Sequence, residues 1–119
     1  MARVVSTRDR CHQVKRWLEI EFPVDRNVRL RVEALTKDSH PDDIAQCFTG
    51  RPALIRIKKG RPLGESIESV IHEWAHLRTE RFGAFWIREG DGHDEHFYLE
   101  EGKIKIAFRD YGADASREN

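Results

Sequence analysis

Two histidines and a glutamate, His72, Glu73 and His76, are the residues of this sequence best placed to do chemistry. Residues four apart in a helix lie one turn apart on the same face, so the imidazoles of His72 and His76 can reach one metal ion. Zinc binds imidazole readily, and catalytic zinc sites take three protein ligands and a water. The spacing therefore predicts a site for one zinc ion, with His72 and His76 as two of its ligands.

Glu73 lies between the two histidines and, at about 100° per residue, roughly 80° around the helix from their mean direction. Its carboxylate need not bind the metal. It can accept the proton of the zinc-bound water, whose pKa the metal lowers toward about 7. A purely structural site has no need of such a base, so Glu73 is the predicted general base of a hydrolytic reaction.

The residues around the motif predict the helix that it needs, from about Gly64 to Arg81. Its apolar positions recur at helical spacing and form one stripe, made of Ile67, Val70, Ile71, Trp74 and Leu77. His72 and His76 point roughly 120–180° away from this stripe. We therefore expect them on the polar face of the helix, and the alternative without chemistry is a pair of solvated surface histidines.

A third ligand has to come from a segment beyond this helix, and Gly92-His93-Asp94-Glu95-His96-Phe97 offers one. With the histidine pair, this segment resembles the SprT-like zincin metallopeptidases of the HExxH type, which include small phage-encoded members. In that family a segment of the form His-Gly-Pro-Glu-Phe follows the active-site helix. His93 and Phe97 match this pattern, whereas the three residues between them do not.

The resemblance covers roughly residues 67–111 and implies a zinc-dependent metallopeptidase. It implies that His93 joins His72 and His76 as a ligand of one zinc ion, and that Glu73 is the catalytic base. The predicted reaction is the hydrolysis of peptide bonds by a metal-activated water.

Three other residues compete with His93 for the third ligand position. His96 lies one helical turn after it. Glu100 and Glu101 lie 24 and 25 residues after the second histidine of the motif, a spacing that zincins with a glutamate ligand allow. Arg78 departs from the family pattern, since it stands at a position after the second histidine where zincins usually have an apolar residue.

The whole sequence predicts elements in the order α-β-β-β-α-α, a minimal zincin-like α+β domain with a small three-stranded sheet packed by helices. A first helix is expected from Ser6 or Thr7 to about Glu21, because Pro23 pushes the residue before it out of the helical region. Strands are predicted at residues 28–34 and 53–58 by strict alternation, and near residues 45–48.

The last helix is expected from about Asp94 to Tyr111, after a loop at residues 84–92. Its apolar stripe comprises Phe97, Ile104, Phe108 and Tyr111. Residues 111–119 are mostly small and polar and are expected to form a frayed tail. No repeat or linker interrupts the chain, so residues 1–119 are predicted to be a single domain.

Composition also bears on the partners and the cellular compartment of the protein. The 119 residues hold 21 basic and 21 acidic side chains, and this balance gives no strong signal for nucleic acid. No apolar run is long enough to span a membrane, and no secretory signal is visible. Cys11 and Cys47 have no metal-binding or redox spacing and are expected to be buried and reduced. A cytoplasmic protein is therefore expected, in the host cytoplasm if the chain is phage-encoded.

The expected partner is a polypeptide substrate. In zincins the peptide lies in extended form beside an edge strand, and residues 45–48 or 53–58 could provide that edge. The alternative function is a catalytically inactive zincin-like protein that uses its metal for structure or partner binding.

Overall fold

The protein is described by a computed structural model over residues 6–34, 45–79, 86–87 and 95–117. The predicted ligand His93 lies outside these ranges. Within them, no helix is long and apolar enough to cross a membrane. In chain order the elements are α1 (Thr7–Glu21), β1 (Val28–Glu33), β2 (Ala45–Phe48), β3 (Ala53–Lys58), α2 (Leu63–Thr79), β4 (Trp86–Ile87) and α3 (Glu95–Arg117).

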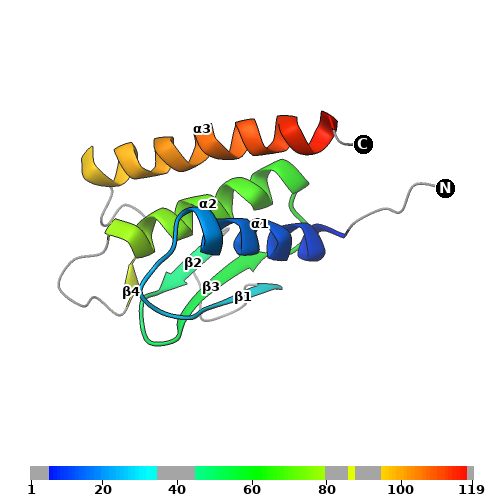
Figure 1. The fold of residues 1–119 in the computed structure, drawn as a ribbon. Helices are drawn as coiled ribbons and strands as arrows, with labels where there is room; N and C mark the ends of the chain where they lie inside the picture. The colour runs from blue at the N-terminus through cyan, green and yellow to red at the C-terminus, as the bar shows by residue number, and fades with distance from the viewer. Residues whose placement is uncertain (1–5, 35–44, 80–85, 88–94, 118–119) are drawn as a thin grey trace.

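The sheet has four strands in the order β1-β3-β2-β4 (Figure 1). β1 runs parallel to β3, whereas β2 is antiparallel to both β3 and β4. Every second side chain of β1 and β3 is buried, as the alternation in the sequence predicts. Together with Cys47 of β2, these side chains form the sheet's part of the core: Val28, Leu30, Val32, Ala53, Ile55 and Ile57.

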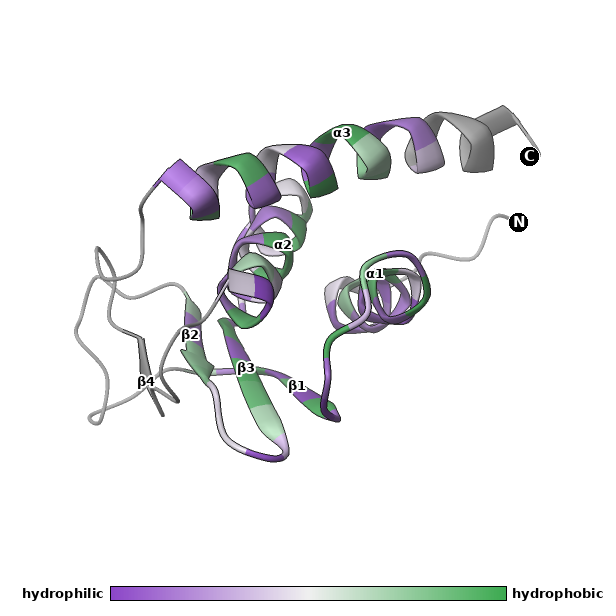
Figure 2. Cartoon of the chain, turned by 60° about the vertical axis from the view of Figure 1, so that its left-hand side comes forward, coloured by the Kyte–Doolittle hydropathy of each residue, from purple (hydrophilic) through white to green (hydrophobic). Residues whose placement is uncertain are grey.

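The helices lie on one side of the sheet in two layers (Figure 2). α1 and α2 pack against the sheet, and α3 packs on α2 on the side away from the sheet. Trp17 of α1 also reaches α3, where its ring centroid lies 5.3 Å from that of Phe108 and 5.4 Å from that of Tyr111. α2 is therefore covered by the sheet and α1 on one side and by α3 on another.

The ends of α1 follow from local chemistry. Ser6 caps the helix, because its hydroxyl accepts a hydrogen bond from the backbone N–H of Asp9 at 3.1 Å. The helix ends before Pro23, as predicted. The carbonyl of Phe22 then accepts a hydrogen bond from Nε1 of Trp74 at 2.7 Å, which ties the end of α1 to the centre of α2. Trp74 is fully buried.

The α+β class and the three helices agree with the sequence prediction, but the order of elements differs. β4 lies inside the segment predicted to be a loop, so the observed order is α-β-β-β-α-β-α. This strand has two residues, which pair with Cys47 and Phe48, and is too short to leave a periodic signal. Cys11 and Cys47 are buried and unbridged, as expected.

The last helix also differs from its prediction. α3 starts at Glu95 and continues to Arg117, six residues beyond the expected end at Tyr111. The small residues read as a frayed tail include Ala113 and Ala115, and alanine has the highest helix propensity of all residues.

Replacing Trp74 by phenylalanine should lower the free energy of unfolding by about 1–3 kcal/mol, because it removes a buried donor and leaves the Phe22 carbonyl unsatisfied. Urea unfolding followed by far-UV circular dichroism measures the change. Trp17→Phe is the matched control, since the contacts of Trp17 within the described residues are with aromatic rings. Equal losses in the two variants would contradict the importance of the Trp74 hydrogen bond.

Candidate metal centre

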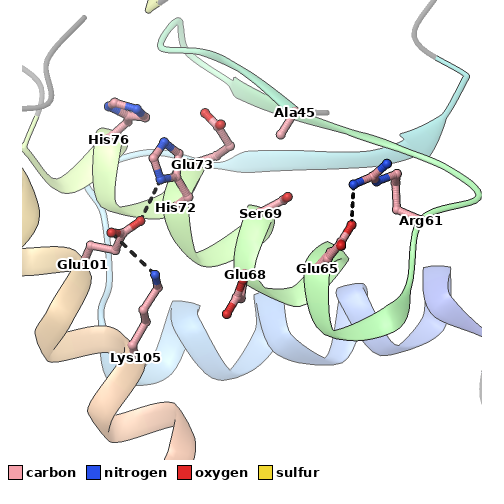
Figure 3. A pocket seen from close by; sticks show the side chains of 10 residues that line it. All are labelled: Ala45, Arg61, Glu65, Glu68, Ser69, His72, Glu73, His76, Glu101 and Lys105. Carbon is pink, nitrogen blue, oxygen red and sulfur yellow. Dashed lines mark hydrogen bonds and ion pairs between the residues drawn. The ribbon is translucent and has the colours of Figure 1, made fainter. Parts of the chain in front are cut away.

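His72, Glu73 and His76 of α2 line one cavity of about 410 Å³. α2 forms its floor, while Ala45 of β2 lies on one side and Glu101 of α3 on the other (Figure 3). The cavity thus lies where the helix that carries the motif meets both the sheet and the last helix.

The two histidine rings are neighbours, as their spacing on the helix predicts. Their centroids lie 4.9 Å apart, and the ring planes are inclined by 84°. The side chain of His72 is 32% exposed, whereas His76 is only 3% exposed. His76 therefore lies beneath the surface, and His72 lies closer to the mouth of the cavity.

Phe97, in the first turn of α3, covers both histidines. Its ring stacks on His76 at 4.4 Å between centroids and meets His72 edge-on at 5.0 Å. Phe97 is itself fully buried. The face of α2 opposite the apolar stripe is therefore not a solvated polar face, because α3 packs on it. The alternative of two solvated surface histidines does not fit the burial of His76.

Glu73 is 7% exposed and extends toward the side of the cavity where Ala45 lies (Figure 3). Its position next to the histidine pair agrees with the offset expected from the helical wheel. Burying a carboxylate at this depth is costly, because a charged group loses its hydration there.

His72 has a charged neighbour on α3. Its Nδ1 lies 2.7 Å from Oε2 of Glu101, and Oε1 of Glu101 lies 3.6 Å from Nζ of Lys105, one turn further along the same helix. Figure 3 shows both contacts at the edge of the cavity. Glu101, one of the alternative third ligands, is thus in the site, and its carboxylate already contacts both His72 and Lys105.

Glu100, the neighbour of Glu101, binds Arg78 instead of a histidine. It is 8% exposed, and its Oε1 accepts a hydrogen bond from Nε of Arg78. Arg78 also donates from Nη1 to the carbonyl of Pro23 at 2.6 Å and lies over the ring of Phe22. Arg78, the residue that departs from the family pattern, therefore ties α2, the end of α1 and α3 together.

The predicted third ligand cannot be placed, because His93 lies outside the described residues. Of its rivals, His96 is exposed and Glu100 is bound to Arg78, and neither lines the cavity. In the part of the chain that the structure describes, no group of three histidine, cysteine or acidic side chains is arranged to hold a metal ion. The described residues contribute two adjacent imidazoles and, beside them, a buried carboxylate. The two imidazoles suit zinc, and a third protein ligand would complete the site.

Sequence reasoning missed several residues of this cavity. Ser69 lies one turn before Glu73, and Arg61 lies at the far end of the cavity in an ion pair with Glu65. Lys105 could have been found as an i,i+4 partner of Glu101 on a predicted helix. No local signal predicts the contact of Glu101 with His72, because it joins two helices 29 residues apart in sequence.

Comparison with known proteins adds no relative: no family model, curated protein or solved structure matches this chain.

The pair formed by Arg78 and Glu100 makes stability depend on pH. Burial raises the pKa of Glu100, but the hydrogen bond and charge of Arg78, with the charge of Lys103, bring the net pKa below its ordinary value of 4.5. A carboxyl with a lowered folded-state pKa contributes stability above its unfolded pKa. That contribution is lost as the pH falls below 4.5 through the folded-state value.

Replacing Arg78 by methionine should therefore lower the free energy of unfolding by about 2–3 kcal/mol at neutral pH, since the buried Glu100 loses the hydrogen bond and charge of Arg78 and keeps Lys103 at 3.6 Å. The difference from wild type should shrink as the pH falls, because Glu100 becomes protonated first in the variant, which lacks the pKa-lowering effect of Arg78, and then below 4.5 in the wild type as well. Urea unfolding at a series of pH values measures the difference in the free energy of unfolding between the two proteins. The double variant Arg78→Met, Glu100→Met should recover part of the loss, and a difference that stays constant with pH would contradict the role of Glu100.

Proposed function

We propose that this protein is a zinc-dependent metallopeptidase of the SprT-like zincin type. One observation carries the proposal: His72, Glu73 and His76 line one cavity, with the two imidazoles adjacent and the carboxylate beside them.

His72 and His76 would hold the zinc ion, with His93 as the proposed third ligand. When bound, zinc lowers the pKa of water and polarises a carbonyl group. Phe97 holds the two imidazole rings from the side of α3, and its apolar ring reduces access of bulk water to His76.

Glu73 would act as the general base. Its carboxylate faces the cavity next to the histidine pair and can take the proton of the attacking water. The same group can then pass that proton to the leaving amine. Its burial keeps the carboxylate in one place, and a base needs this positioning to reach its proton.

A peptide substrate would lie along β2. Of the two strands considered from the sequence, β3 is inside the sheet, between β1 and β2, and offers no edge. β4 pairs only with Cys47 and Phe48, so within the described residues Ala45 has a strand neighbour on β3 alone. Ala45 also lines the cavity, which supports an extended peptide pairing here and passing over the histidines.

The proposal places the enzyme in the cytoplasm. Cys11 and Cys47 are both buried and unbridged, a state that suits a reducing compartment.

Replacing Glu73 by glutamine should leave zinc binding intact and lower peptide hydrolysis at least about 100-fold, because the metal ligands stay while the base is lost. The hydrolysis of casein or a peptide by the zinc-loaded protein tests the loss of activity. The zinc content of the same samples tests whether metal binding is intact. Replacing His72 or His76 by alanine should abolish zinc binding as well as activity.

Two results would count against this function. Equal hydrolysis by wild type and Glu73→Gln would rule out Glu73 as the base. A wild-type protein that binds one zinc ion but cleaves neither casein nor peptides would favour the alternative of a zincin-like protein that uses its metal for structure or partner binding.

A further inference from the structure

The contact between Glu101 and His72 indicates which ring nitrogen of His72 carries the proton. Nδ1 of His72 lies 2.7 Å from Oε2 of Glu101, within hydrogen-bond distance. An ionised carboxylate can only accept hydrogen bonds, so the proton of the neutral ring has to be on Nδ1. The lone pair available to bind a metal is then on Nε2.

Glu101 is itself held in place. Its side chain is only 13% exposed, and its second oxygen lies 3.6 Å from Nζ of Lys105. One oxygen thus faces the imidazole and the other faces an ammonium group. A carboxylate with both oxygens in use is poorly placed to bind the metal directly and well placed to orient the histidine that does.

Neighbouring side chains of α3 also keep Glu101 beside His72. Glu100 and Glu101 are adjacent, and they contact Arg78 and His72, which lie on α2 six residues apart. Phe97, one turn earlier on α3, stacks on His76. Three side chains of α3 therefore fix this helix against α2, and the carboxylate of Glu101 stays beside His72 without support from a metal.

We propose that Glu101 is a positioning residue: it holds His72 in the tautomer with the proton on Nδ1 and directs Nε2 toward the metal, and it is not a metal ligand. The role of Glu101 in zinc binding rests on the proposed function. The tautomer of His72 does not rest on it, because Glu101 contacts His72 without any metal.

The tautomer can be measured on the metal-free protein. At about pH 8 histidine side chains are largely neutral, and two-bond ¹H–¹⁵N correlation spectra distinguish the two ring nitrogens. We expect His72 to carry its proton on Nδ1 in the wild type and to shift toward the Nε2-protonated form in Glu101→Ala. Glu101→Gln should keep the wild-type tautomer, because its amide oxygen still accepts the hydrogen bond.

Glu68→Gln is the matched control. Glu68 also lines the cavity and lies one turn before His72, so the change removes the same charge from the same region. The tautomer of His72 should not move in this variant. An unchanged tautomer in Glu101→Ala, or an equal shift in Glu68→Gln, would overturn the proposal.

Zinc affinity, measured by competition with a chelating dye, separates a positioning residue from a ligand. Glu101→Ala should weaken zinc binding about 10–100-fold, as loss of a hydrogen-bond partner of a metal-bound histidine does, and Glu101→Gln should weaken it less. A loss in Glu101→Gln as large as that in His72→Ala would show that Glu101 is a ligand and would overturn the proposal. A wild type that binds no zinc would contradict the proposed function, while the tautomer would still decide the role of Glu101.

Discussion

The packing of α3 on the histidine face of α2 is the contact on which the site depends. Without it, His72 and His76 would be two polar side chains on a solvated helix, since the apolar stripe of α2 already packs on the sheet and α1. Phe97 covers both rings, and His76 becomes almost fully buried. The same contact brings Glu101 to His72. In the proposed site, the helix that carries the motif would supply the reacting groups, and the last helix buries them.

Much of the fold follows from short-range patterns in the sequence. The strict alternation at residues 28–34 and 53–58 predicts β1 and β3, and the apolar stripe through Val70 and Trp74 predicts α2. These signals are strong because each element buries one face against the rest of the core. β4 leaves no signal because two residues carry no period. The continuation of α3 to Arg117 is hidden by a small, polar composition, although Ala113 and Ala115 have high helix propensity.

The site was less predictable than the fold, for a physical reason. The spacing of His72, Glu73 and His76 is a local property of one helix, so a helical wheel places the three side chains on neighbouring faces. The burial of His76 and the contact of Glu101 with His72 depend on how α3 crosses α2, which no local pattern specifies. The sequence could rank Glu101 only as one possible ligand. The geometry shows its carboxylate shared between an imidazole and an ammonium group.

The charges along this interface suggest why such a small domain can keep polar groups inside. Glu100 and Glu101 each contact a group on α2 and a lysine on α3, so neither carboxylate is buried without a partner. Glu73 lies nearby, is also buried and lines the cavity. Burying ionisable groups next to one another costs stability that a wholly apolar interface would not lose. A chain of 119 residues has little stability to spare. If Glu73 is the base proposed above, the hydrolytic reaction would account for the cost of burying its carboxylate beside the two imidazoles.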